Sequence, residues 1–180
     1  MMRLHILKNW SVGLATPLVA GLTIALGVVA GATPASAQAA YGSYVGVGGS
    51  LGLTDGDGVT EDNSNGAVIA ARYRLLEVPV SLRAQVLISD ATAVVPTVSY
   101  DIPLSWYTDA YIGAGVAFQD SNTDTSPIGN QTSFVIQPGV DHRIPRSRLV
   151  LFGNAIIAFD AYRAGGGTAA AIQGGVGVRF

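Results

Sequence analysis

Apolar and polar residues alternate along most of the chain that follows residue 40. In Val80–Ser89, apolar side chains at the even positions alternate with the polar Ser81, Arg83 and Gln85. The last segment, Thr168–Phe180, has the same period and ends on an aromatic residue. A period of two residues is that of a β-strand whose two faces meet different surroundings.

This pattern recurs in eight segments, each of about 9–13 residues, which is close to the length that a tilted strand needs to cross a membrane. The predicted strands are Tyr41–Leu53, Gly66–Leu76, Val80–Ser89, Thr92–Ile102, Tyr107–Gln119, Thr132–Ile144, Arg148–Asp160 and Thr168–Phe180. No long amphipathic helical pattern interrupts them.

The connections between these segments are of two kinds. The short ones each contain a proline, which suits a turn, and they are residues 77–79, 103–106 and 145–147. Of the other four, three are longer and polar and one is short: residues 54–65, 120–131, 161–167 and 90–91. An even number of strands with short turns at one end and longer loops at the other is typical of outer-membrane barrels.

Composition decides which face of the strands meets water. Charged residues make up only 12% of the chain, and after residue 37 there are eight arginines, twelve acidic residues and no lysine. The polar face holds Gly, Ala, Ser and Gln with a few Arg and Asp, which suits a narrow lumen better than a soluble exterior. The sequence therefore predicts an all-β fold, an eight-stranded antiparallel up-and-down transmembrane β-barrel.

Aromatic residues gather at both ends of the predicted strands, as expected for rings at the two membrane interfaces. The predicted periplasmic group is Tyr41, Tyr100, Trp106, Tyr107 and Phe180, and the opposite group is Phe118, Phe134, Phe159 and Tyr162.

The first 37 residues have the features of an export signal. Arg3 and Lys8 precede an apolar stretch over residues 11–32, and Ala35-Ser36-Ala37 offers a cleavage site between small residues. We expect residues 1–37 to be a cleaved signal peptide and residues 38–180 to be the barrel domain. An uncleaved membrane anchor is the alternative, because the apolar stretch is nearly long enough to span a bilayer.

In layout, strand number and terminal strand the chain resembles the small outer-membrane barrels of the OmpA transmembrane domain, OmpX and opacity-protein kind. The ending with Val176, Val178 and Phe180 resembles the carboxy-terminal signal by which the barrel-assembly machinery recognises such proteins. We predict a monomer in the outer membrane, with membrane lipid and lipopolysaccharide as its partners and the barrel-assembly machinery as its partner during biogenesis.

Charged residues fall on the predicted inward face of several strands. They are Arg72, Arg74, Arg83, Asp101, Asp109, Asp141, Arg143, Arg148 and Arg179. Charges in a narrow lumen must be paired or hydrated. We interpret this set as a salt-bridge network that fills the lumen; the alternative is a small, hydrated path.

The predicted outer loops are acidic. Their acidic residues are Asp55, Asp57, Glu61, Asp62, Asp90, Asp120, Asp124 and Asp160. The first loop is rich in oxygen ligands, but it lacks the full spacing of a calcium loop, so we predict a solvated loop, with weak divalent-ion binding as the alternative. An acidic surface could also use divalent ions to contact anionic lipopolysaccharide. No cofactor or structural metal is predicted.

Signals for catalysis are weak. His142 is the single histidine after residue 37, and Ser147 is the nearest candidate nucleophile, but no motif joins them. We predict that the protein is not an enzyme and does not bind nucleic acid. The predicted role is structural, or an interaction at the cell surface through the acidic loops. A small-solute, porin-like channel is the alternative, and a soluble periplasmic lipocalin-like ligand-binding barrel comes third.

Overall fold

The computed structural model describes residues 42–54, 65–119, 126–163 and 166–180. The predicted signal peptide lies outside the described residues. The described strands are β1 (Tyr44–Gly52), β2 (Asn65–Arg74), β3 (Val80–Ile88), β4 (Thr92–Pro103), β5 (Thr108–Gln119), β6 (Ser133–Arg143), β7 (Leu149–Phe159) and β8 (Thr168–Arg179).

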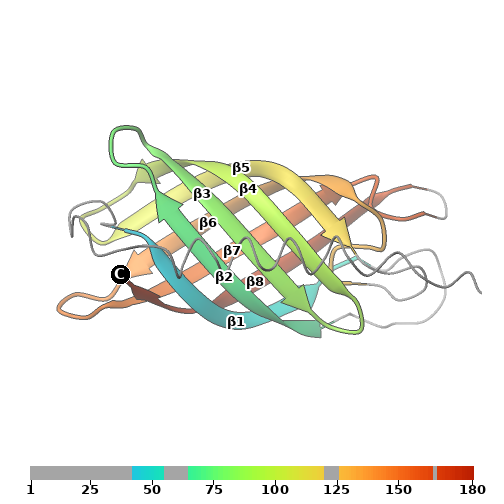
Figure 1. Ribbon diagram of the computed structural model, residues 1–180, viewed down its shortest axis with the longest axis horizontal. Helices are drawn as coiled ribbons and strands as arrows, with labels where there is room; N and C mark the ends of the chain where they lie inside the picture. Colours follow the sequence, from blue (N-terminus) through green and yellow to red (C-terminus); the bar gives the residue numbers. More distant parts are fainter. Residues whose placement is uncertain (1–41, 55–64, 120–125, 164–165) are drawn as a thin grey trace, which may run out of the picture. The chain divides into compact units, whose positions relative to one another are not determined.

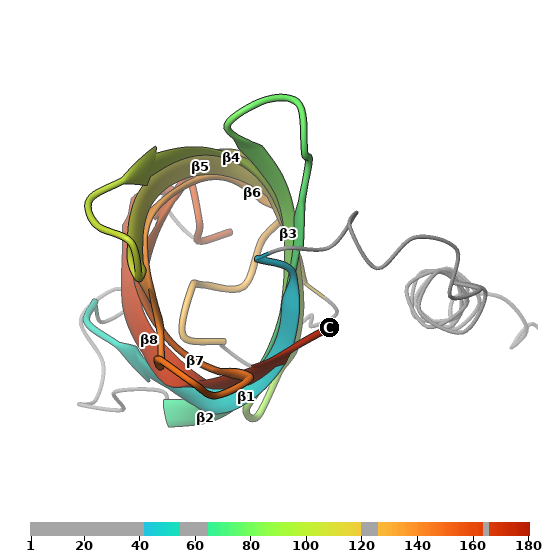
Figure 2. The same ribbon diagram turned by 90° about the vertical axis from the view of Figure 1, so that its left-hand side faces the viewer.

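Each strand pairs antiparallel with the next one in the chain, and β8 pairs with β1 to close the sheet (Figures 1 and 2). The fold is therefore a closed, eight-stranded up-and-down β-barrel, as the alternation predicts. The three short turns lie at the same end as the carboxyl terminus (Figure 1). We call this the short-turn end and the opposite end the loop end. Among the described residues, no helix is long and apolar enough to cross a membrane.

The strand boundaries coincide with the predicted ones at several ends, such as Val80, Thr92 and Thr168, and differ from them by at most three residues elsewhere. β1 begins at Tyr44 and β7 ends at Phe159, because the backbone turns at Gly42 and at Asp160, whose φ angles are 106° and 56°. Both angles lie in the left-handed region, which a strand does not tolerate.

The two faces of the strands have the phase that the sequence predicts. In β3, Ser81, Arg83 and Gln85 are buried inside the barrel, while Leu82 and Ile88 are exposed on its outside. The same inside-polar, outside-apolar arrangement holds around the sheet at the short-turn end and in the middle of the barrel.

Two prolines interrupt the ladders in the middle of strands. Pro96 of β4 and Pro138 of β6 face outward, and the pairing of β4 with β5 and of β6 with β7 has a gap at each of them. Proline has no N–H to donate, so each one removes a hydrogen bond from the ladder. The β5–β6 hairpin thus has an uninterrupted internal ladder and a gap on either side.

Inward-facing glycines make room for the aromatic rings in the lumen. A Cβ atom added to Gly139 would lie 2.7 Å from the Cβ of Asn154 and closer still to the ring of Tyr111. Gly177 stands in the same way against the ring of Tyr44. Glycine is needed at these positions because a narrow lumen cannot hold a ring and a side chain at the same level.

We expect Gly139→Ala to lower the free energy of unfolding by about 1–3 kcal/mol, the usual cost of overpacking. Gly153→Ala is the matched control, because that glycine faces outward on the neighbouring strand and its added Cβ would meet only a carbonyl oxygen at 3.8 Å. The measurement is urea unfolding of each variant in lipid vesicles, and equal midpoints for the two variants would contradict this account of the packing.

Candidate functional site: the interior of the barrel

Four charged side chains form a ring inside the barrel near the short-turn end. Arg72 of β2 lies 2.8 Å from Asp101 of β4 and 2.9 Å from Asp141 of β6. Arg83 of β3 contacts the same two carboxylates at 3.3 and 2.8 Å. All four residues are buried, and each cation bonds to both anions, so the ring is electrically balanced.

The register of the strands explains why these charges meet across the lumen. Arg72 lies directly opposite Arg83 on β2 and β3, and Asp109 lies directly opposite Asp141 on β5 and β6. Like charges in such cross-strand pairs repel each other. Ion pairs across the lumen offset this repulsion: Arg72 and Arg83 both bond to Asp141, and Arg72 also lies 3.5 Å from Asp109, so opposite charges join the two walls.

Hydroxyl groups and an aromatic ring make further contacts with the four buried charges. The Tyr44 hydroxyl donates to Asp141 at 2.9 Å, and the Ser81 hydroxyl donates to Asp101. The Arg83 Nε donates to the Ser99 hydroxyl at 2.9 Å, and its guanidinium lies 3.3 Å from the centroid of the Tyr111 ring. Sequence reasoning missed both tyrosines, because alternation gives the face of a residue but not its partners across the barrel.

Asp109 has its own cations beside the ring. Arg74 donates to it at 3.2 Å, Arg72 lies 3.5 Å away, and Arg143 lies at 3.8 Å. The Arg143 guanidinium also donates to the Trp106 carbonyl at 2.9 Å, which fixes the β4–β5 turn against the end of β6.

Two of the arginines that the sequence places in the network lie elsewhere. Arg148 is exposed in the turn before β7, because the strand starts one residue later than predicted and inward parity has no meaning in the turn. Arg179 is half-buried at the rim, and its guanidinium donates to the Ser147 carbonyl. Neither has an ion pair with the buried aspartates in the described part of the chain.

Next to the charged layer, the lumen is lined by uncharged polar side chains. The Thr97 hydroxyl donates to the side-chain amide oxygen of Gln137 at 2.7 Å. Gln173 lies opposite Ser50 on one side and opposite Asn154 on the other. These residues are buried, and several of their amide and hydroxyl atoms have no protein partner among the described residues.

Toward the loop end the lumen becomes apolar, and the chain itself closes it. Val95, Val135 and Ile156 are buried there, and Ile128 of the β5–β6 connection is fully buried with them. Figure 2, a view along the barrel from the short-turn end, shows the described part of this connection, residues 126–132, inside the outline of the strands. Sequence reasoning missed this closure, although Ile128 is the one large apolar residue in an otherwise polar loop.

Hydrogen bonds hold the closing segment in place. The Gln119 amide donates to the Ile128 carbonyl at 3.1 Å, and the backbone N–H groups of Asn130 and Gln131 donate to the Ala161 carbonyl at 3.0 and 3.1 Å. Gly129 has a φ of 101°, and a Cβ there would collide with Ala161. The segment is therefore packed against the start of the β7–β8 connection.

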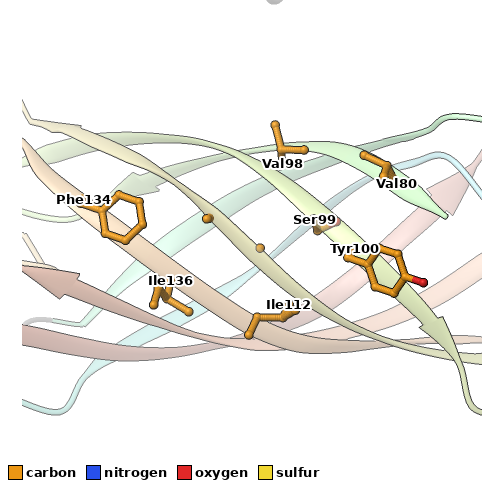
Figure 3. A pocket seen from close by; sticks show the side chains of 9 residues that line it. Val80, Val98, Ser99, Tyr100, Ile112, Phe134 and Ile136 are labelled. Carbon is orange, nitrogen blue, oxygen red and sulfur yellow. The ribbon is translucent and has the colours of Figure 1, made fainter. Parts of the chain in front are cut away.

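The outside of the barrel is apolar along the strands. A shallow hollow over β3–β6 is lined almost entirely by apolar atoms, with Val98, Ile112 and Phe134 among its walls (Figure 3). The exposed aromatic residues lie near both ends of the strands: Tyr73, Tyr100, Trp106, Tyr107, Phe118, Phe134, Phe159 and Phe180. Tyr162 differs from its predicted place at the rim, because it packs against the interior cluster and its hydroxyl contacts Thr54. Tyr41 lies outside the described residues.

The remaining candidate residues are separate from the interior. His142 faces outward, and its Nδ1 shares a hydrogen bond of 2.9 Å with the Thr108 hydroxyl. The Ser147 hydroxyl accepts from the backbone of Leu149 at 3.0 Å. The predicted ion-binding loop with Asp55, Asp57, Glu61 and Asp62 lies outside the described residues, as do Asp120 and Asp124, whereas Asp90 and Asp160 are exposed at the loop end.

The sequence matches no protein-family model and no curated protein. Among solved structures, Neisserial surface protein A is similar over 78% of this chain and 99% of its own, with 16% identity and a TM-score of 0.54. Ail of Yersinia pestis, in a complex with the heparin analogue sucrose octasulfate, is similar over 77% of this chain and 97% of its own, with 18% identity and a TM-score of 0.52. A designed transmembrane β-barrel gives 14% identity and a TM-score of 0.51, over 77% of this chain and 96% of its own.

At these identities the similarity concerns the fold alone. The chain has the fold of the small eight-stranded outer-membrane barrels, as its layout suggests.

We expect Arg83→Leu to lower the free energy of unfolding by about 3–5 kcal/mol, because it leaves Asp101 and Asp141 buried with one cation fewer. The same substitution at the exposed Arg148 is the matched control, and it should change stability by no more than about 0.5 kcal/mol. Urea midpoints of the two variants in vesicles measure the difference. A similar midpoint for both variants would mean that the buried ring does not stabilise the fold.

Proposed function

We propose that the protein is an outer-membrane β-barrel with a closed lumen, and that its role is structural or lies in contacts made at the cell surface. The observation that carries this proposal is the distribution of polarity: ion pairs occupy the lumen near the short-turn end, uncharged polar side chains line its middle, and apolar side chains cover the outside. In water, a barrel would be stable with the opposite arrangement.

The exterior supports a place in a bilayer over a soluble periplasmic barrel. Val47, Val98 and Val178 are each more than half exposed, as are several other large apolar residues on different strands. Exposed apolar surface of this extent is costly in water but not in lipid. A lipocalin-like barrel also needs an apolar cavity for its ligand, whereas here a charged layer lies near the short-turn end and the buried Ile128 packs into the apolar part of the lumen.

Export and assembly follow from the same proposal. Residues 1–37 would direct export and be removed, and the barrel-assembly machinery would recognise the last strand. Val176, Val178 and Phe180 support this role because all three are exposed on one outward face at the short-turn end. We propose the barrel as a monomer surrounded by lipid and lipopolysaccharide.

Contacts at the surface would use the acidic loops. Ail was solved with a sulfated ligand. We propose a different preference for this chain, because its loop end holds many carboxylates in the sequence and would repel a polyanion. Divalent cations between these carboxylates and lipopolysaccharide phosphates are the contact that this charge favours. No catalytic role is proposed, since His142 faces outward and pairs with a threonine.

A small-solute channel is the second candidate, and one observation favours it. The amide atoms of Asn154 and Gln173 have no partner among the described residues, and such atoms prefer to be hydrated. Conduction would require both the ion ring and the Ile128 closure to open. Single-channel recording in planar bilayers distinguishes the two candidates, because a closed barrel gives no steady current.

The test is membrane fractionation of the expressed full chain, followed by gel mobility with and without boiling. We expect to find the chain in the outer-membrane fraction, and we expect its gel mobility to change on boiling. A folded barrel resists unfolding by the detergent until it is heated. Deletion of Phe180 should reduce the heat-modifiable fraction, and substitution of the exposed Leu104 in the β4–β5 turn by Ala is the control. Recovery in the soluble periplasmic fraction without a mobility change would overturn the proposal, and a normal yield after Phe180 deletion would overturn the role of the last strand.

A further inference from the structure

The arginines are distributed unevenly between the two ends of the barrel. Of the eight arginines after residue 37, Arg72, Arg74 and Arg83 belong to the charged layer, and Arg163 lies at the loop end. The other four are together at one corner of the short-turn end: Arg143, Arg146, Arg148 and Arg179. We call these four residues the arginine corner.

The backbone holds the arginine corner together. Arg143 ends β6, Arg146 and Arg148 lie in the turn to β7, and Arg179 ends β8. The N–H of Arg179 donates to the Arg148 carbonyl at 2.8 Å, so β8 ends beside the turn. Figure 1 shows the β6–β7 turn at the same end of the barrel as the carboxyl terminus.

The two guanidinium groups in the turn are available to a ligand. Arg146 and Arg148 are exposed, and neither has a carboxylate partner within the described part of the chain. The other short turns differ: residues 104–107 have no charge, and residues 75–79 have only Glu77. Arg146 and Arg148 therefore give this turn a local positive charge that has no ion pair with an acid of the described chain, whereas Arg143 beside them is paired with Asp109 at 3.8 Å.

Apolar side chains lie directly next to the corner on the outer face. Leu149 is paired with Val178, and Leu151 with Val176, and all four are exposed. On the other side, the Arg143 guanidinium donates to the carbonyl of Trp106, whose side chain is 90% exposed. A cation between an apolar wall and an exposed indole matches the depth at which lipid headgroups lie.

We propose that the arginine corner binds the phosphate headgroup of an anionic phospholipid, with the acyl chains lying along Leu149, Leu151, Val176 and Val178. This inference rests on the proposed membrane location. Arginine suits the phosphate because its planar fork donates two parallel hydrogen bonds. The ligand belongs to the leaflet at the short-turn end, away from the acidic loops that would repel it.

The test uses the full chain, purified from membranes in neutral detergent, with phosphatidylglycerol or phosphatidylcholine added in mixed micelles and bound lipid counted by native mass spectrometry. We expect phosphatidylglycerol to be retained in preference to phosphatidylcholine. The double variant Arg146→Gly and Arg148→Gln should lose roughly twenty-five-fold in affinity for phosphatidylglycerol, since each arginine near a lipid surface contributes roughly a factor of five. Glycine suits position 146, because the φ of Arg146 is 60° and an L side chain is strained there.

Two variants serve as controls. Arg163→Gln removes one positive charge at the loop end and should leave phosphatidylglycerol binding unchanged. The double variant Arg146→Lys and Arg148→Lys keeps the charge without the fork and should recover part of the affinity. Gel mobility with and without boiling is recorded for every variant, so that a failure to fold is distinguished from a loss of lipid binding.

Several outcomes would overturn the inference. They are equal retention of the two lipids, wild-type binding by the Gly and Gln double variant, and an equal loss in Arg163→Gln. Binding of inorganic phosphate without any retention of phosphatidylglycerol would show that the corner recognises free phosphate, and this too rejects the lipid. A chain that shows no heat-modifiable form at all would contradict the proposed membrane barrel itself.

Discussion

The buried ring of Arg72, Arg83, Asp101 and Asp141 is the interaction on which the rest of the barrel depends. A single unpaired charge in such a site would be far more costly than the ring is stabilising, because removing one partner leaves the other charges uncompensated. The ring therefore works as a constraint: the strands can close only in a register that brings both cations to both anions. That register turns the polar faces inward and leaves the apolar faces outside.

The packing of the rest of the interior depends on the space that the four buried charged side chains occupy. Tyr44 and Tyr111 fill the charged layer, and Gly139 and Gly177 leave room for their rings. Beyond the uncharged polar layer, the lumen is apolar and Ile128 closes it. The lumen is thus closed by charge at one end and by apolar packing at the other. The outside has no comparable layers, because a surface that faces hydrocarbon requires only apolar side chains between two aromatic rims.

Much of this architecture could be predicted from the sequence, because strand number and phase are local properties. The alternation around Arg83 and Asp141 places both residues inside without any knowledge of their partners. The partners could not be predicted, since they depend on the stagger of strands far apart in the chain. Arg148 shows the limit of parity: it has the inward parity of β7 but lies in the turn, where the alternation stops. The position of Ile128 is equally non-local, because its partners come from other strands and from a second connection.

The most direct test of the account asks what the outside of the barrel touches. We would replace Trp10 and Trp106 with Phe, introduce Val98→Trp at the middle of β4, and measure indole fluorescence in vesicles of lipids brominated in the middle of their acyl chains. Val98 faces outward and is 53% exposed, so the account predicts strong quenching of the new indole. A fluorescence that the brominated lipids leave unchanged would mean that the apolar face does not meet hydrocarbon, and it would contradict the account.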